Sequence, residues 1–331
     1  MRYLGSKTLL LNEIEVLAKE YSSSGVFCDP FGGIGTVGKN MKQHGYKIIT
    51  GDVLYFAHCF QIAQIVNNGD IQFAKLRNQM NSADINGIEL YLNTLEPIDG
   101  WVVEEYAKKR LYFTVENAQK IQACIDSIIR WKLEDTINED EYKVLMASLI
   151  ESFDKVANTA GTYYAYLKEF YRKATKRFQF KFIQPSLSNL QCYSYHKAAN
   201  ELVRETECDI LYLDPPYNER DYSRYYHFPE NVARGIVPHP TGKSGVYSEY
   251  KKRSAYNVKT QATNAFQDLI EHANAKCIIF HYTDAGLINP NTAREIMSVY
   301  GKTEEFYYQC KGYRTSINPA LSQHHIIRVI K

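Results

Sequence analysis

Short apolar runs alternate with helix-like stretches over the first and last parts of the chain. The runs with the length and composition of buried strands are residues 25–29, 46–52, 208–214 and 275–282. Residues 53–66 have the spacing of a helix, and residues 304–314 and 324–331 predict a terminal hairpin. Buried strands separated by helices are typical of an open, mostly parallel sheet. The pattern therefore predicts an α/β fold.

Residues 70–185 follow a different pattern, because their apolar side chains recur every three or four positions. Ile121, Ile125 and Ile128 show this spacing, which is that of an amphipathic helix. The segment is long enough to form a small helical subdomain of its own. A second departure is the stretch 235–256, whose prolines and glycines predict a long loop. Loops of that length are usually functional or mobile.

Composition narrows the class of protein. The chain has 331 residues, enough for about two domains, with 45% hydrophobic and 23% charged residues, as in a globular protein with a packed core. Lysine and arginine number 39 against 37 acidic residues, a net charge of +2. This balance excludes a uniformly polybasic protein but leaves room for local basic surfaces. Tyrosine is in excess at 27 residues, which suits a protein that stacks on aromatic rings.

Neither a membrane segment nor a secretion signal is visible. No apolar run reaches the roughly 18 residues of a transmembrane helix, and the N-terminus lacks a small-residue cleavage site. Seven scattered cysteines without a CxxC pair indicate reduced thiols, so we expect a cytoplasmic protein without a membrane partner. We predict no metal site. His44, His58 and His227 are not spaced as metal ligands usually are, and the adjacent His324 and His325 lie on a predicted strand, where neighbours face opposite sides.

A glycine-rich loop follows the first predicted strand. Residues 33–38, GIGTVG, match the pattern GxGxxG and precede a predicted helix. Glycines there let the backbone approach a nucleotide, and Asp52, at the end of the next strand, can accept hydrogen bonds from ribose hydroxyls. A tight turn without a ligand and a dinucleotide site are the alternatives. Asp29 ends the first strand, where its carboxylate would repel a pyrophosphate but suit an ammonium group. This favours S-adenosylmethionine over NAD.

A second motif, Asp214-Pro215-Pro216-Tyr217, directly follows the apolar run 210–213, at the carboxyl end of a predicted strand. The amine of a nucleobase is a poor nucleophile because its lone pair is delocalised into the ring. A carboxylate and a proline-fixed carbonyl can accept hydrogen bonds from that amine and direct its lone pair towards an electrophile. The tyrosine offers a ring face on which the base can stack. A rigid turn that merely ends a strand is the alternative.

These motifs together resemble the Dam-like, class alpha adenine-N6 DNA methyltransferases, and they occur in the order of that class. Residues 2–7 (RYLGSK) resemble the family's N-terminal cofactor motif, and residues 29–36 (DPFGGIGT) resemble its glycine motif. The other segments that carry the resemblance are 110–114, 154–168, 218–227, 242–256 and 280–288. The resemblance implies a Rossmann-like, S-adenosylmethionine-dependent methyltransferase sheet with a helical target-recognition insertion.

The resemblance also implies roles for individual residues. Asp214 and the Pro215 carbonyl, with Pro216 beside them, would hold the target amine, and Tyr217 would stack on a flipped adenine. The residues implied at the cofactor are Tyr3, Gly5, Lys7, Asp29, Phe31, Gly32, Gly33, Gly35, Thr36, Asp52, Tyr193 and Asp214. The implied division of the chain is a cofactor-binding part at 1–66, a helical insertion for target recognition and DNA contact at 67–185, and a catalytic part at 186–331 that includes a basic loop at 235–259.

Two stretches depart from the family pattern. Residues 197–200 read KAAN where the family commonly has an acid in an Asp-Ala-Asn pattern, so Ala198 stands in place of that acid. We therefore expect backbone groups near Tyr193 to Tyr195 to hold the adenine of the cofactor. Asp221 and Tyr225 stand where the family often has glutamine and asparagine, so the pocket for the target base is expected to differ in shape.

Two basic stretches are candidates for contact with DNA. Residues 168–181 contain six basic residues and one acid, interleaved with aromatic rings, and residues 242–259 add a basic, glycine-containing loop. Such residues on phosphates give salt-sensitive, sequence-independent affinity. For the first stretch, an amphipathic helix with its rings in the core is the alternative. The predicted DNA-binding residues are Lys168, Arg172, Lys173, Lys176, Arg177, Arg220, Lys243, Lys251, Lys252 and Arg253.

The motifs favour transfer of a methyl group from S-adenosylmethionine to adenine-N6 in double-stranded DNA. One alternative is methylation of cytosine-N4 or of RNA by the same pocket. Another is a non-catalytic DNA-binding subunit on the same fold. No segment is large enough for a nuclease domain, so a cognate restriction endonuclease would be a separate chain, and a solitary modification enzyme is equally compatible with the sequence.

Overall fold

The computed structural model describes residues 1–247, 254–283, 286–311 and 321–331. These residues form two compact units, each assembled from segments that are distant in the sequence. The unit that we name the sheet unit consists of Gly5–Val53, Ser188–Asp221 and Lys252–Lys331. The unit that we name the helical unit consists of Met1–Leu4, Leu54–Leu187 and Tyr222–Lys251. The three predicted parts, divided at residues 66 and 185, thus have other boundaries than these two units. The roles assigned to the three parts stay predictions.

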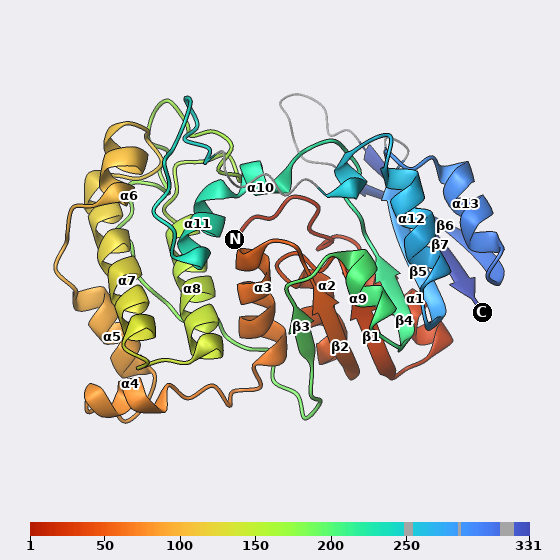
Figure 1. Cartoon of the computed structure of the whole chain (residues 1–331), viewed down its shortest axis with the longest axis horizontal. Coiled ribbons are helices and arrows are strands. Elements are labelled where there is room, and N and C mark those ends of the chain that lie inside the picture. The colour runs from red at the N-terminus through yellow and green to blue at the C-terminus, as the bar shows by residue number, and fades with distance from the viewer. Residues whose placement is uncertain (248–253, 284–285, 312–320) are drawn as a thin grey trace. The chain divides into compact units, whose positions relative to one another are not determined.

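The sheet unit is built on a mixed sheet of seven described strands, in the order β3-β2-β1-β4-β5-β7-β6 (Figure 1). The strands are β1 (Gly25–Asp29), β2 (Tyr46–Gly51), β3 (Tyr193–Tyr195), β4 (Cys208–Leu213), β5 (Ala275–Thr283), β6 (Lys302–Lys311) and β7 (Leu321–Ile330). The first five run parallel, whereas β7 is antiparallel to both β5 and β6. The predicted open, mostly parallel sheet and the terminal hairpin are confirmed.

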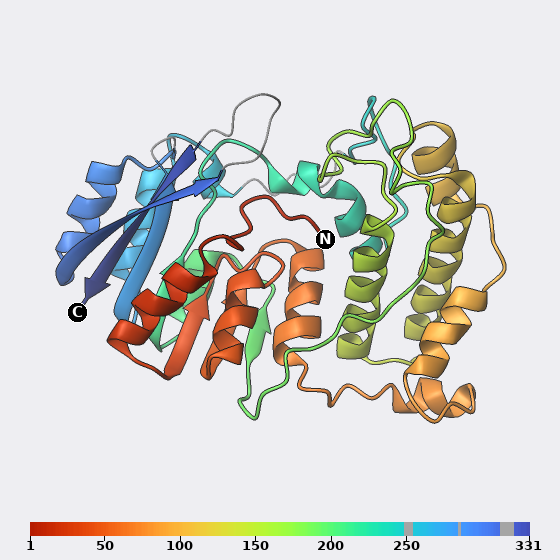
Figure 2. The same cartoon turned by 180° about the vertical axis from the view of Figure 1, so that it is seen from behind.

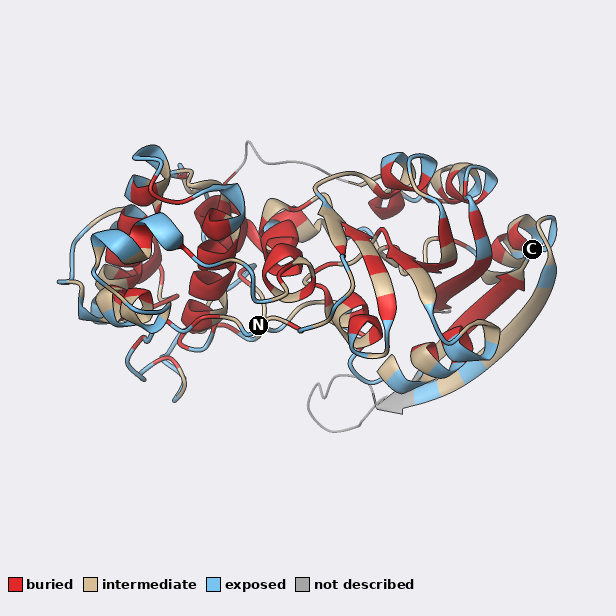
Figure 3. Cartoon of the chain, turned by 90° about the horizontal axis from the view of Figure 1, so that it is seen from below, coloured by how far each residue is buried: buried red, intermediate tan, exposed pale blue. Residues whose placement is uncertain are grey.

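Helices cover both faces of this sheet. The helices of the sheet unit are α1 (Leu11–Tyr21), α2 (Thr36–Gln43), α9 (Ala199–Arg204), α12 (Ala262–Glu271) and α13 (Pro290–Ser298), with a short 3-10 turn at Ala255–Asn257. In Figure 1, α9, α12 and α13 lie in front of the strands, and in the view from behind α1 lies in front of them (Figure 2). The central strands are therefore buried on both sides, as their burial colours show (Figure 3).

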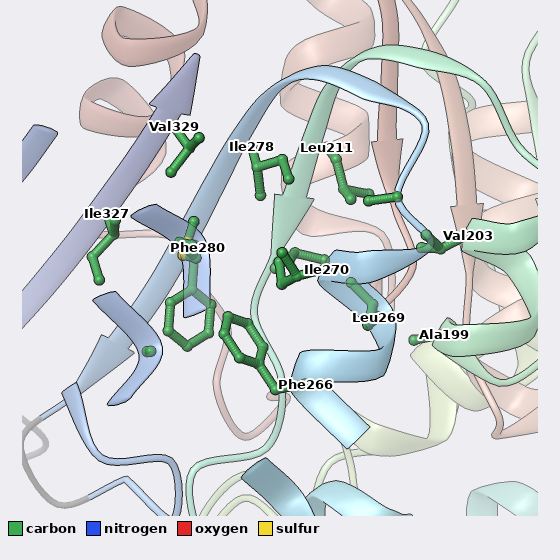
Figure 4. Close-up of a cluster of buried hydrophobic side chains, with 14 of the residues drawn as sticks. Ala199, Val203, Leu211, Phe266, Leu269, Ile270, Ile278, Phe280, Ile327 and Val329 are labelled. Atoms are coloured by element: carbon green, nitrogen blue, oxygen red, sulfur yellow. The ribbon is translucent and has the colours of Figure 1, made fainter. Parts of the chain in front are cut away.

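An apolar cluster joins α9 and α12 to the sheet (Figure 4). The ring of Phe266 on α12 lies 4.5 Å from that of Phe280 on β5. Leu269 and Ile270 on the same helix are buried in the same cluster. Full burial of a side chain of this size stabilises a fold by roughly 1.5–3 kcal/mol. This packing fixes β4 and β5, and with them the residues that follow β4.

Helices were predicted for residues 70–185. The structure confirms them for the first part of this range, up to Asp154. The helices of the helical unit are α3 (Tyr55–Gln61), α4 (Ala74–Gln79), α5 (Asn86–Thr94), α6 (Trp101–Val103), α7 (Val115–Leu133), α8 (Glu139–Asp154), α10 (Tyr222–Tyr225) and α11 (His227–Arg234), with π-helical turns at Ile62–Val66 and Glu104–Lys108. Residues 155–187 contain no helix. The amphipathic helix considered for residues 168–181 is therefore wrong, for a reason that the side chains of this segment show.

Candidate active site

Two carboxylates lie at the same edge of the sheet. Asp29 is the last residue of β1, and Asp214 directly follows β4, its parallel neighbour. Parallel neighbours end at the same edge, which is where open α/β sheets bind their ligands. The two acids are close enough for the charge of Asp214 to act on Asp29. The predicted glycine motif and the predicted catalytic motif thus meet in the sheet unit.

Three side chains contact the carboxylate of Asp214. Lys7 Nζ lies 2.6 Å from Oδ2, the Tyr217 hydroxyl donates to Oδ1, and His281 Nδ1 lies 3.2 Å from Oδ1. Burial acts to raise the pKa of Asp214, but the charge of Lys7 and the interaction with His281 outweigh it and lower the pKa to about 2. Asp214 is therefore a carboxylate, an acceptor of hydrogen bonds, at any physiological pH.

The backbone around Tyr217 is held on both sides of the motif. Leu287 donates its backbone N–H to the Tyr217 carbonyl at 2.9 Å. The buried Asn257 donates from Nδ2 to the carbonyls of Asn218 and Arg220 at 2.8 and 2.9 Å. With Pro215 and Pro216 restricting the backbone before it, the segment that carries Tyr217 has little freedom to shift. Lys7 Nζ also lies 4.7 Å from the centre of the Tyr217 ring.

The glycine loop forms a compact turn ahead of α2. Gly33 and Gly35 have φ angles of 51° and 85°, in the left-handed region that favours glycine. Gly35 N–H donates to the Gly32 carbonyl at 2.8 Å, and Thr36 is the first residue of α2. Asp52 Oδ2 accepts from Gly33 N–H at 3.0 Å, so the predicted ribose-binding acid lies beside the loop. The loop therefore presents backbone, and no side chains at its glycines, to whatever binds there.

Asp29 is buried and incompletely bonded. Asp29 is only 2% exposed, and its Oδ1 has no hydrogen-bond partner among the described residues. Burial raises the pKa of Asp29 to about 8, and the negative charge of Asp214 adds to that effect. A buried acid of this kind lacks a cation. An ammonium group fits, because it would supply both a hydrogen bond to Oδ1 and the missing positive charge.

The other residues predicted at the cofactor lie in different surroundings. Phe31 packs edge-on against Tyr256, with ring centres 4.9 Å apart, and Tyr193 begins β3 beside β2. Gly5 has a φ of 81°, and its carbonyl accepts from Lys7 Nζ at 2.8 Å. Tyr3 belongs to the helical unit, where its ring stacks on Tyr226 at 5.0 Å. Contacts of these residues with a cofactor stay predictions.

The basic segment 168–181 is an irregular stretch of turns and loop in the helical unit, and three asparagines hold its backbone. Asn158 accepts from the Tyr171 N–H at 3.0 Å, and Asn117 accepts from the Phe178 N–H at 2.8 Å. Asn93 accepts from the Phe180 N–H, also at 2.8 Å. Side-chain amides therefore supply the hydrogen bonds that a helix would have supplied from its own backbone, and helical spacing of the rings is not required.

This anchoring separates apolar from basic side chains. Phe178 and Phe180 are buried, whereas Lys168, Arg172, Lys176 and Arg177 are exposed. Lys173 is half-buried, and its Nζ lies 3.4 Å from the Asp154 carbonyl. Arg220 of the sheet unit and Lys243 of the helical unit are exposed. The predicted DNA-contact residues Lys251, Lys252 and Arg253 lie outside the described residues.

His227 and the described cysteines have structural surroundings. His227 is buried, and its Nε2 lies 2.8 Å from the Tyr163 carbonyl; burial lowers its pKa to about 4. Six cysteines, all but Cys310, are described, and each is free and buried, as expected for reduced thiols. No group of three or more metal-ligating side chains is found where the structure is described. None of the helices described has the length and apolar character to cross a membrane.

Comparison with known proteins identifies the family. Residues 3–296 match the model of the D12 class N6 adenine-specific DNA methyltransferases. The chain belongs to this family. It is 34% identical over 326 residues to the type II methyltransferase M.FokI of Planomicrobium okeanokoites, covering 95% of this chain and 49% of that protein. It is 35% identical over 313 residues to the type II methyltransferase M.NlaIII of Neisseria lactamica, covering 91% of this chain and 89% of that protein.

A third relative is the modification methylase StsI of Streptococcus sanguinis, 34% identical over 307 residues, which cover 91% of this chain and 46% of that protein. The chain thus spans about half the length of M.FokI and of StsI. Membership of the D12 class confirms the predicted fold, a methyltransferase sheet with a helical insertion, and the class uses S-adenosylmethionine as methyl donor.

Several residues of the site were not predicted from the sequence. His281 and His324 were assigned no role at the site, yet His281 contacts Asp214. Asn257 was not singled out either, although it holds the segment after the catalytic motif. A histidine on an apolar strand is usually a core residue, so only the pairing of β5 beside β4 reveals it. The asparagines Asn93, Asn117 and Asn158 gave no signal beyond a polar residue in an amphipathic stretch.

Proposed function

We propose that this chain transfers a methyl group from S-adenosylmethionine to the N6 amine of adenine at a specific site in double-stranded DNA. The observation that carries the proposal is the position of the Asp214–Tyr217 motif next to Asp29, at the shared edge of β4 and β1. Membership of the D12 class supports adenine over cytosine as the target. The buried, incompletely bonded Asp29 supports a cationic cofactor over NAD.

The residues of the sheet unit would divide the work as follows. The cofactor supplies a methyl group on a positively charged sulfur, and Asp29 would hold the ammonium group of its methionine part. The glycine loop and Asp52 would hold the sugar. Asp214, kept ionised, would accept one hydrogen bond from the target amine, and the Pro215 carbonyl would accept the other. Tyr217 would stack on the base, so that positioning and electrostatics supply most of the rate.

The contacts of Tyr217 bear on how the amine enters. Its hydroxyl donates to Asp214 Oδ1 when no base is present, so it takes the acceptor that the amine needs. An entering amine would replace the hydroxyl at Oδ1, while His281 keeps its contact with the same oxygen. The hydroxyl also lies 2.7 Å from His281 Nδ1, which is a second possible hydrogen-bond partner for it.

The exposed basic residues of segment 168–181 support a role in DNA binding. The segment has no helix to keep it in place, but three asparagines and two buried rings fix its backbone. Fixed backbone lets basic side chains meet phosphates at a lower cost in conformational entropy than a loose loop would. We extend the proposal to Lys243 on the same unit and to Arg220 on the sheet unit.

Replacing Arg172, Lys176 and Arg177 together with glutamine is expected to weaken binding to duplex DNA equally for all sequences. Each lost phosphate contact lowers the slope of log affinity against log salt by about 0.9, so the triple variant should lose about 2 to 3 in slope. Fluorescence anisotropy with labelled duplexes over a salt series measures this change. Lys108→Gln is the matched control, because Lys108 is exposed on the same unit but paired with Glu104. An unchanged slope in the triple variant would remove this segment from the DNA surface.

The proposal also covers the cellular location of the protein and a partner protein. Six free, buried thiols suit a reducing compartment, which supports the cytoplasm. Relatives of this chain are named as type II methyltransferases and modification methylases, which supports pairing with a separate restriction endonuclease. Single-molecule sequencing of DNA from cells that express only this chain identifies the methylated site. An endonuclease that cuts this site only when it is unmethylated is the expected partner.

The activity itself is tested with labelled cofactor. Duplex DNA, single-stranded RNA and cofactor alone are incubated with the protein, and label bound to nucleic acid is counted. The proposal expects label in duplex DNA. Label in RNA alone supports the RNA alternative, and cofactor binding without any transfer supports a non-catalytic subunit. Either result would overturn the proposed function.

A further inference from the structure

Two histidines connect the catalytic carboxylate to the edge of the site. His281, on β5, is fully buried, with Nδ1 3.2 Å from Asp214 Oδ1 and Nε2 3.0 Å from His324 Nδ1. His324, on β7, is half-buried, and its ring stacks on that of His281 with centres 5.1 Å apart. β7 lies directly beside β5, so the terminal hairpin brings the second histidine to the first.

The reaction proposed above needs an exit for a proton. As the amine nitrogen forms its bond to the methyl carbon, the carbon–sulfur bond breaks and its electron pair stays on sulfur. The nitrogen then carries a positive charge, two hydrogens and the methyl group, and it must lose one proton. Asp214 Oδ1 is the acceptor that touches this amine in the proposed arrangement. Asp214 is a weak base, so a group behind it has to take the proton onwards.

We propose that His281 and His324 form this exit, carrying the proton from Asp214 to solvent. His281 Nδ1 takes the proton from Asp214 Oδ1, and His281 Nε2 gives its own proton to His324 Nδ1. His324 then releases a proton from its second nitrogen to water. No proton is gained or lost by the pair, but each ring ends with its proton on the nitrogen that received one. A half-turn of each ring restores the starting tautomer before the next turnover. The proposal rests on the proposed methyl transfer.

The hydrogen bonds around His281 permit this direction. Its two ring nitrogens face different partners, so one can accept while the other donates. The tautomer required carries its proton on Nε2 and leaves Nδ1 as the acceptor. The Tyr217 hydroxyl, 2.7 Å from Nδ1, donates to it until Asp214 hands over its proton. The titratable side chains that face His281 are Lys7, Asp214, Tyr217 and His324.

The proton affinities of Asp214 and His281 agree with an outward step between these two groups. The pKa of Asp214 is about 2, set by burial against the stronger effects of Lys7 and His281. Burial lowers the pKa of His281 to about 4, and the charge of Lys7 acts in the same direction. Burial also lowers the pKa of His324 from its ordinary value of 6.5. His281 therefore holds a proton more firmly than Asp214, yet it is neutral at physiological pH and free to accept one.

Two variants of His324 separate proton transfer from simple positioning. We expect His324→Ala to slow single-turnover methyl transfer by about a hundredfold, on the scale of general acid–base catalysis, and added imidazole to restore much of the rate. His324→Asn keeps a side-chain hydrogen bond for His281 but cannot pass a proton, so it should stay slow with or without imidazole. His324 is used because His281 is fully buried, and its replacement is the more disruptive.

His272→Ala is the control, since His272 is an exposed histidine of the same unit that bonds to Asp268. Its rate should equal that of the unmodified protein, with and without imidazole. A wild-type rate in His324→Asn would show that His324 only positions His281, and it would overturn the exit. Slow transfer by His324→Ala without rescue would overturn it as well.

A second readout does not depend on activity. Nitrogen-15 NMR of the histidine rings in the ligand-free protein reports which nitrogen carries the proton. We expect His281 and His324 to titrate as a coupled pair and the His281 signals to shift in His324→Ala. Independent titration of the two rings would contradict the exit even if methyl transfer is observed. Absence of transfer by the unmodified protein would contradict the proposed function instead.

Discussion

Replacing Asp214 with alanine is expected to lower the rate of methyl transfer by about a thousandfold or more while cofactor affinity stays within a few fold of the unmodified protein. The reason is that Asp214 is the ionised acceptor for the target amine, and loss of a preorganised polar group at a reacting atom has effects on this scale. Single-turnover transfer of labelled methyl to duplex DNA and a cofactor titration measure the two quantities separately.

The control for this change is Asp268→Ala, which removes an exposed carboxylate of the same unit that pairs with Arg204. It should transfer methyl groups at the normal rate. Because Asp214→Ala also leaves Lys7 without its partner, Asp214→Asn is a useful second variant that keeps the size of the side chain. Near-normal transfer by both Asp214 variants would remove this residue from the mechanism.

Replacing Asp29 with asparagine is expected to have two opposite effects. Cofactor affinity should fall by about ten- to a hundredfold, because a hydrogen bond to a charged group contributes roughly 1.5–3 kcal/mol. The ligand-free protein should become more stable at neutral and alkaline pH, because the substitution removes a buried acid that lacks a cation. Calorimetric titration with the cofactor measures the first effect, and denaturant unfolding at several pH values measures the second.

The pH dependence of the second effect has a definite sign. Burial raises the pKa of Asp29 from 3.8 to about 8, so between these values the folded state keeps a proton that the unfolded state loses. The free energy of unfolding of the unmodified protein therefore falls as pH rises through this window, by at most about 1.4 kcal/mol for each pH unit. Asp29→Asn lacks this loss, so its advantage should be largest at about pH 8 and above.

Asp209→Asn is the matched control for the stability measurement. Asp209 lies near the amino end of β4, away from the edge that carries Asp214, and a salt bridge to Lys276 lowers its pKa. Its replacement should lower stability above pH 4, roughly the ordinary pKa of the acid, and leave cofactor affinity unchanged. If Asp29→Asn behaved like Asp209→Asn, Asp29 would not be the buried acid that awaits a cation.

Much of the sheet unit was predictable because its signals are local. The apolar runs that became β1, β2, β4 and β5 are bounded by turn residues, and the motifs stand at the ends of the runs. The position of Asp29 and Asp214 at one edge follows from the parallel order of β1 and β4, and only the fold shows that those two strands are adjacent. The three-residue β3 was too short to give a pattern of its own.

The parts that escaped prediction depend on long-range contacts. A helix was considered for residues 168–181 because basic and aromatic residues are interleaved there, but Asn93 and Asn117 bond to that backbone from positions about 60 to 90 residues earlier. Nothing in a local window indicates these bonds. His281 and His324 likewise are brought together only by the pairing of β5 with β7, 43 residues apart in the sequence.

The central claim, methylation of adenine-N6 in DNA, is tested most directly by identifying the modified base. Plasmid DNA from cells that lack other DNA methyltransferases and express this chain is digested to nucleosides, which are separated and identified by mass. We predict N6-methyldeoxyadenosine in DNA from cells that express the unmodified chain. It should be missing from DNA of cells that express Asp214→Ala. N4-methylated deoxycytidine, or DNA without any methylated base when cofactor binding is intact, would contradict the claim.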